Sequence, residues 1–164
     1  MRRVLLCLLL IIGAVLGGCG GGENTDFLEP FRAAYTAEVS GTLCGIDFAA
    51  TLERGEPGEG IYAPTTVTFY APSALSGTIL VRAADGSVTV KSGGLTVSDM
   101  GGIGASLFDL FPTSGAISQP EVTSEGRTRL VVGSATVELL PDGTPYSVKT
   151  PDVSVAVVNW YGSK

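Results

Sequence analysis

The chain has 164 residues, 45% of them hydrophobic, and it carries a formal net charge of −6 with no histidine. This acidic balance repels nucleic-acid phosphates, so nucleic-acid binding is not expected. The lack of histidine excludes serine–histidine and cysteine–histidine catalysis and removes the commonest metal ligand, so we expect no metal and no cofactor.

The first eighteen residues have the layout of a secretory signal peptide. A basic head, Arg2 and Arg3, is followed by an apolar run at 4–16 and by two glycines before Cys19. The apolar run is shorter than the roughly 17 to 25 residues that cross a bilayer as a helix. A permanent transmembrane helix is therefore not expected here.

The segment Leu16-Gly17-Gly18-Cys19 resembles the lipobox of bacterial lipoproteins. The resemblance implies cleavage before Cys19 and a diacylglyceryl group on its thiol, which would hold the protein at the extracytoplasmic face of the cell membrane. The alternative is an ordinary secretory leader with a chance cysteine. We expect a signal peptide at 1–18, a lipidated cysteine and polar tether at 19–25, and a single domain at 26–164.

The domain is expected to begin with a short amphipathic helix near 26–35, where Phe27, Phe31, Ala34 and Tyr35 recur at helical spacing. The period then changes to the two residues typical of β-strands. At 46–53 this alternation predicts a strand that buries Ile46, Phe48, Ala50 and Leu52, preceded by a hairpin at Cys44-Gly45. With no partner inside the domain, Cys44 is interpreted as a buried apolar residue.

Three further features mark the ends of later strands. Pro72 lacks the amide hydrogen that a strand ladder needs, so it should end the strand at 65–70. The dipeptides Asp85-Gly86 and Asp142-Gly143 suit tight turns and predict hairpins, whereas the polar run 54–60 predicts an exposed loop. The closing strand, 153–161, alternates so that Val153, Val155 and Val157 share one face while Trp160 lies on the other.

One segment, 100–112, breaks the strand pattern. It is rich in glycine and apolar residues, and Leu107, Leu110 and Phe111 can share one face of a short helix that Pro112 ends. With the flanking strands, it predicts a mainly β (α+β) fold: a curved antiparallel sheet or half-open β-barrel with an N-terminal helix and a short helix across the concave face.

No catalytic arrangement emerges from the acidic residues. Glu53, Glu56 and Glu59 belong to a charged loop region, and Asp85 and Asp142 are turn residues, so none is held as a glycosidase pair would be. Asp99 and Asp109 flank the apolar helix as candidate caps. We therefore expect no enzymatic activity.

The order of elements, and the segment 67–77 followed by a hairpin, resemble the LolA/LolB/LppX-like lipoproteins. These are half-open β-barrels with helices across the concave face, so the resemblance implies either a concavity that holds acyl chains or a fold reused for envelope interactions without cargo. The candidate ligand contacts are Phe69, Met100, Leu107, Phe108, Leu110 and Phe111. The alternative for each residue is ordinary core packing.

Two functions therefore remain open. The first is a tethered module that binds a lipid, an acyl chain or another apolar ligand beneath the helix, with the membrane as its other partner through Cys19. The second is a non-catalytic module with a filled core that docks another envelope protein.

Overall fold

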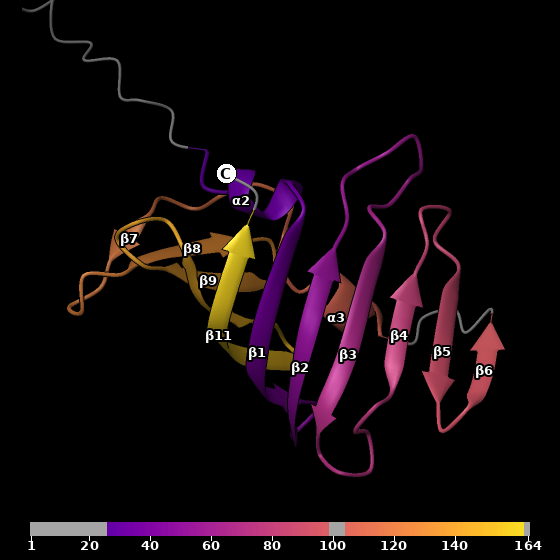
Figure 1. The fold of residues 1–164 in the computed structure, drawn as a ribbon. Helices are drawn as coiled ribbons and strands as arrows, with labels where there is room; N and C mark the ends of the chain where they lie inside the picture. The colour runs from indigo at the N-terminus through magenta and orange to yellow at the C-terminus, as the bar shows by residue number, and fades with distance from the viewer. Residues whose placement is uncertain (1–25, 99–103, 163–164) are drawn as a thin grey trace, which may run out of the picture.

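The computed structural model describes residues 26–98 and 104–162, which form one antiparallel sheet of eleven strands and two short helices (Figure 1). Residues 1–25, with Cys19, and Met100 lie outside the described residues, so the predicted leader and tether stay predictions. The elements are α2 (Glu29–Arg32), β1 (Tyr35–Leu43), β2 (Ile46–Arg54), β3 (Thr65–Ala71), β4 (Ile79–Arg82), β5 (Val88–Ser92), β6 (Leu95–Ser98), α3 (Ala105–Phe108), β7 (Glu121–Val122), β8 (Thr128–Val132), β9 (Ala135–Leu139), β10 (Pro145–Lys149) and β11 (Val153–Gly162).

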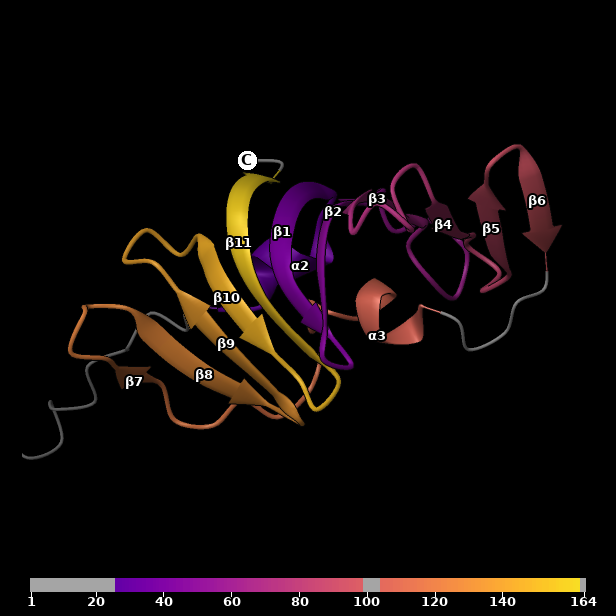
Figure 2. The same ribbon diagram turned by 90° about the horizontal axis from the view of Figure 1, so that it is seen from below.

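The sheet is curved and unclosed, which confirms the predicted fold class. Its order is β6-β5-β4-β3-β2-β1-β11-β10-β9-β8-β7, so the first and last strands of the domain pair in the middle and the two edges are β6 and β7. Figure 2 shows the sheet bent around a concave side on which α3 lies. No helix within the described ranges is long and apolar enough to cross a membrane.

Short turns connect several pairs of neighbouring strands, as the glycine-containing dipeptides predict. Cys44 and Gly45 both have positive φ, at 49° and 80°, which matches a two-residue turn between β1 and β2. This turn leaves Cys44 exposed, so the prediction that it is buried is wrong. The hairpins at Asp85-Gly86 and Asp142-Gly143 are confirmed, and β3 ends at Ala71, directly before Pro72.

The core fills the concave face of the sheet. The inward residues Phe48, Ala50 and Leu52 of β2 are buried as predicted, but Ile46 is exposed because it borders the turn at the end of the strand. In the middle of the sheet, Gly41 lies opposite Val155 of β11. A Cβ atom at Gly41 would lie 2.0 Å from the Ser154 carbonyl oxygen, so only glycine permits this approach.

The N-terminal helix is shorter than the predicted span of 26–35. It covers Glu29–Arg32, and Tyr35 is already the first residue of β1, where it pairs with Arg54 and Gly162. Two neighbouring strands satisfy the backbone of Tyr35, so pairing overrides the helical pattern there. The ring of Phe31 is fully buried.

A β-bulge in β11 changes which side of the sheet Trp160 faces. Glu38 pairs with Asn159 and Val39 with Val157, which leaves Val158 as the extra residue. Beyond the bulge the alternation is inverted, so Trp160 packs against the core together with Val155 and Val157. The predicted placement of Trp160 on the opposite face is therefore wrong.

This inversion separates Trp160 from its neighbour Tyr161, which is 61% exposed. We expect Trp160→Ala to lower the free energy of unfolding by about 2–3 kcal/mol, because it empties space between aromatic rings. The matched change Tyr161→Ala should cost no more than about 0.5 kcal/mol. Urea titrations of both variants measure the difference, and equal losses would contradict the inverted register.

Candidate functional site

The helix on the concave side starts close to the sheet. Gly104 precedes α3 with φ 75°, and a Cβ atom there would lie 2.8 Å from Cδ1 of Leu80 in β4. This close approach lets a four-residue helix turn its apolar side chains into the core. Of the predicted helical segment 100–112, the described part is helical only at Ala105–Phe108.

The candidate ligand contacts that the structure describes all belong to one buried core. Phe69 comes from β3, and its ring centroid lies 6.0 Å from that of Phe48. The others come from α3 and the residues that follow it. Each is at most 3% exposed, so a ligand reaches them only if α3 moves: Phe69, Leu107, Phe108, Leu110 and Phe111.

Four aromatic rings join distant parts of the chain at one end of the concave face. Trp160 of β11 stacks on Tyr35 with ring centroids 4.5 Å apart, and it meets the edges of Phe31 and Phe111 at 5.9 and 5.2 Å. Phe31 and Phe111 stack at 5.5 Å. The cluster fixes the segment after α3 against α2 and the middle of the sheet.

A buried arginine lies at the edge of α3. Arg82 of β4 is 5% exposed, and its Nη1 donates a hydrogen bond to Oδ1 of Asp109 at 2.7 Å. Its guanidinium carbon lies 4.7 Å from the ring centroid of Tyr62 and 5.1 Å from that of Phe108. Its Nη2 also donates a hydrogen bond to the Phe108 carbonyl oxygen at 3.4 Å. Two rings, one carboxylate and one carbonyl therefore hold the cation in place.

The loop before β3 brings Tyr62 to this position. The Tyr62 amide donates a hydrogen bond to the Ala84 carbonyl at 3.1 Å, which fixes the loop on the β4–β5 turn. At Gly86 a Cβ atom would lie 2.8 Å from the Tyr62 ring, so the turn glycine leaves the space that the ring needs. Residues far apart in sequence therefore surround Arg82.

The environment of Arg82 leaves part of its polar surface unmatched. Its Nε is buried without a hydrogen-bond partner, and its ion-pair partner Asp109 has a side chain that is 64% exposed. Desolvating a cation costs several kcal/mol, which an exposed carboxylate repays only partly. A cavity of about 170 Å³ lies beside the guanidinium, between Tyr62, Val88 and Phe108.

Arg82 and Tyr62 are not among the candidate residues predicted from the sequence. The available signal was the alternation in β4, because a charged residue stands two positions after buried Leu80, on the same face. In register, Arg82 pairs with Thr65, which pairs with Arg54 of β2, so two arginines occupy one concave-side row. The Nε of Arg54 is also buried without a partner.

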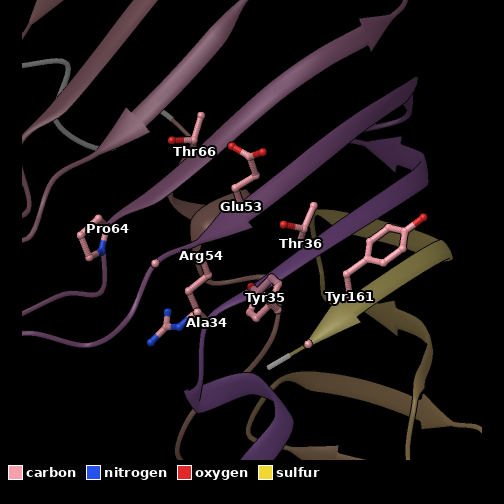
Figure 3. Close-up of a pocket in the computed structure, with 10 residues that line it drawn as sticks. Ala34, Tyr35, Thr36, Glu53, Arg54, Pro64, Thr66 and Tyr161 are labelled. Carbon is pink, nitrogen blue, oxygen red and sulfur yellow. The ribbon is translucent and has the colours of Figure 1, made fainter. Parts of the chain in front are cut away.

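A second cavity, of about 460 Å³, lies at the ends of β1, β2, β3 and β11 (Figure 3). Glu53 and Arg54 both line it, but in Figure 3 the carboxylate and the guanidinium point away from each other. Successive strand residues face opposite sides of a sheet, so these two groups do not form an acid–base pair.

Two of the other acidic residues considered as catalysts, Asp85 and Asp142, are turn residues. The backbone amides of Ser87 and Thr144 donate hydrogen bonds to Asp85 and Asp142, and these bonds lower the pKa of both carboxyls. Glu53, Glu56 and Glu59 are exposed, Asp99 lies outside the described residues, and Asp109 is the ion-pair partner of Arg82.

Across 26–98 and 104–162 no group of His, Cys, Asp or Glu side chains has the arrangement of a metal site. The expectation that the protein is not an enzyme stays a prediction.

The concave face continues as an apolar strip beyond α3. Leu80 of β4 pairs with Val90 of β5, and Val90 pairs with Val97 of edge strand β6, so the three side chains share one face. Exposure rises toward the edge: Leu80 is buried, Val90 half-buried and Val97 48% exposed. Leu95, two residues before Val97 on the same face, is 74% exposed. We call Val90, Leu95 and Val97 the apolar strip.

Comparisons with known proteins support the fold. No family model and no curated protein matches the chain. The crystal structure of an uncharacterized conserved protein from Thermus thermophilus superposes with a TM-score of 0.54 over 85% of each chain, at 15% identity. A Vibrio parahaemolyticus domain, provisionally described as an outer membrane lipoprotein-sorting protein domain, gives a TM-score of 0.44 over 81% of this chain and 86% of that one, at 10% identity. The first likeness shows a shared fold.

Tyr35 should make the free energy of unfolding fall at alkaline pH. Burial raises the pKa of its phenol far above the ordinary value, although Arg54 and Arg82 act in the opposite direction. The unfolded chain releases this proton near pH 10 while the folded chain retains it, so stability should fall as pH rises above about 10, by up to about 1.4 kcal/mol per pH unit. Urea titrations at pH 8 and pH 11 should show a smaller fall for Tyr35→Phe than for the natural protein. An equal fall would contradict this assignment.

Proposed function

We propose that the protein is held at the extracytoplasmic face of the cell membrane by lipid on Cys19 and that its domain binds the apolar chain of a lipid or lipoprotein along the concave face of the sheet. The observation that carries this proposal is the apolar strip, an exposed continuation of the core on the concave side of β5 and β6. Exposed apolar side chains that adjoin a core mark binding surfaces more often than isolated ones do.

An acyl chain lying on the strip would be stabilised by burial of its own methylene groups. Each buried CH₂ contributes about 0.8 kcal/mol, so several must be covered before binding outweighs the cost of ordering the chain. The strip continues into the core at Leu80, beside α3. Movement of α3 would add Phe69, Leu107, Phe108, Leu110 and Phe111 to the contacts, and Met100 belongs to the same proposal.

The proposed anchor keeps the domain close to the bilayer. Residues 20–25 separate Cys19 from Asp26, and the seven steps from one Cα atom to the next span at most about 25 Å even when fully extended. Because α2 begins at Glu29, the end of the sheet that carries α2 would stay within a short distance of the headgroups (Figure 1). A lipid taken from the membrane would therefore have a short path to the domain.

A second candidate function is docking of another envelope protein. The observation that favours it is the close filling of the concave face under α3, where Leu107 and Leu110 are buried against the sheet. The edge strands β6 and β7 each lack a neighbour in the sheet on one side. An extended segment of a partner would add to such an edge through backbone hydrogen bonds. Crosslinking in intact cells should then recover one dominant partner, and its absence would count against docking.

Lipidation at Cys19 is tested directly by mass spectrometry of the protein isolated from its own cells. We expect the natural chain to begin at Cys19 with a diacylglyceryl mass on the thiol. Cys19→Ser should remove the lipid and the membrane association, because serine lacks the accepting sulfur, whereas Cys44→Ser should change neither. A natural product that begins at Met1, or that carries an unmodified thiol at Cys19, would refute the anchor.

Binding along the strip is tested by native mass spectrometry of lipid that co-purifies after gentle extraction. Val97→Lys places an ammonium group on the apolar strip and should reduce bound lipid about tenfold, because burying an unpaired charge is costly. Thr96→Lys is the matched control, since its side chain lies on the other face of the same strand. A natural protein free of co-purified lipid, or equal losses in the two variants, would contradict the proposed binding mode.

A further inference from the structure

Arg82 is a buried cation whose carboxylate partner is not buried with it. The guanidinium is buried against two aromatic rings, and its Nη2 donates a hydrogen bond to the Phe108 carbonyl oxygen at 3.4 Å. Its Nε has no hydrogen-bond partner, and its carboxylate partner Asp109 is largely in solvent. A buried cation is best stabilised by an anion that is buried with it and accepts two of its hydrogen bonds. Asp109 accepts from Nη1 only and remains free to exchange that contact for water.

The space that a second anion would need lies next to the guanidinium. The cavity of about 170 Å³ is bordered by Arg82 and Asp109, by the rings of Tyr62 and Phe108, and by Val88. Its lining therefore combines one cation and one carboxylate with the carbon atoms of two rings and of Val88. An oxyanion fits the cation, and the adjoining carbon atoms suit an apolar group attached to that anion.

The cavity and the apolar strip lie on the same face of the sheet. Arg82 pairs with Val88, and two residues further along the same strands Leu80 pairs with Val90, which pairs with Val97. A two-residue step along a strand is about 7 Å, roughly the length of five or six methylene groups. A headgroup at Arg82 would thus place an attached chain at the start of the strip.

From this arrangement we propose that Arg82 binds the anionic headgroup, a carboxylate or a phosphate, of an amphiphile whose chain lies on the apolar strip. The inference rests on the proposed binding of an apolar chain to the strip, and it adds the chemical class of the ligand's headgroup. Asp109 acts as the internal competitor: its carboxylate occupies the guanidinium when no ligand is bound and moves into solvent when one arrives. The selected ligands are fatty acids and phosphatidate-like lipids rather than neutral lipids.

The test compares four small probes on the full chain reconstituted in phosphatidylcholine nanodiscs, with empty nanodiscs as the blank. Equilibrium dialysis measures binding of octanoate, 1-octanol, acetate and inorganic phosphate. Octanoate should bind about tenfold more tightly than 1-octanol, because only the carboxylate forms charge-assisted hydrogen bonds. Acetate and inorganic phosphate should bind at least tenfold more weakly than octanoate, because they lack the chain.

Two variants and one control separate the contributions of Arg82 and Asp109 to octanoate binding. Asp109→Asn removes the competing charge and should tighten octanoate binding about tenfold while leaving 1-octanol unchanged. Arg82→Gln should abolish the preference for octanoate, and Arg129→Gln, an outer arginine paired with Glu138, should leave it intact. If Arg82→Gln does not fold, the Asp109→Asn result decides alone, because Asp109 is largely exposed.

Each alternative outcome has its own meaning. Equal binding of octanoate and 1-octanol, or no effect of Asp109→Asn, would overturn the role of Arg82 and leave the proposed apolar-chain function standing. Binding of neither octanoate nor 1-octanol would overturn both. If phosphate or acetate binds as tightly as octanoate, the proposal that the ligand is an amphiphile is overturned, and the site binds free anions instead.

Discussion

Contact among Phe31, Tyr35, Phe111 and Trp160 holds the curved sheet around its concave face. A sheet with one apolar face must cover that face, and here the covering side chains come from the beginning, the middle and the end of the domain. Because α2, the segment after α3 and β11 meet at these rings, the placement of α3 depends on the cluster. The β-bulge at Val158 is part of the same constraint, since without it Trp160 would point outward.

The aromatic cluster leaves the concave face unevenly covered. Toward β1 and β11 the face is filled by rings, and α3 covers it at β3 and β4. Toward β5 and β6 the face ends in the half-exposed apolar strip. Arg82 lies at the boundary between these two regions, where the edge of α3 meets the β4–β5 turn. A charge at such a boundary costs free energy in the folded protein, and the proposed anionic ligand would offset that cost.

The strand pattern was predictable because it depends on neighbouring residues in the sequence. Alternation at 46–53, the proline at 72 and the aspartate–glycine pairs each act within a few residues, and the structure has strands and turns at these places. The helix expected at 26–35 is shorter, because Tyr35 gains two strand partners that no local pattern reveals. The faces of β11 were misassigned because a bulge shifts register without a sequence signal.

The candidate site was likewise predictable from the sequence only in part. The sequence by itself determined that the segment containing Leu107 and Phe111 is apolar and that a curved antiparallel sheet would receive it, since composition and period are local properties. Only the tertiary structure decided that Arg82 is buried beside Tyr62 and Asp109, and that Val97 and Leu95 extend the core on the same face. The physical reason is that a charge's environment, unlike a strand's alternation, is set by side chains brought together from distant parts of the chain.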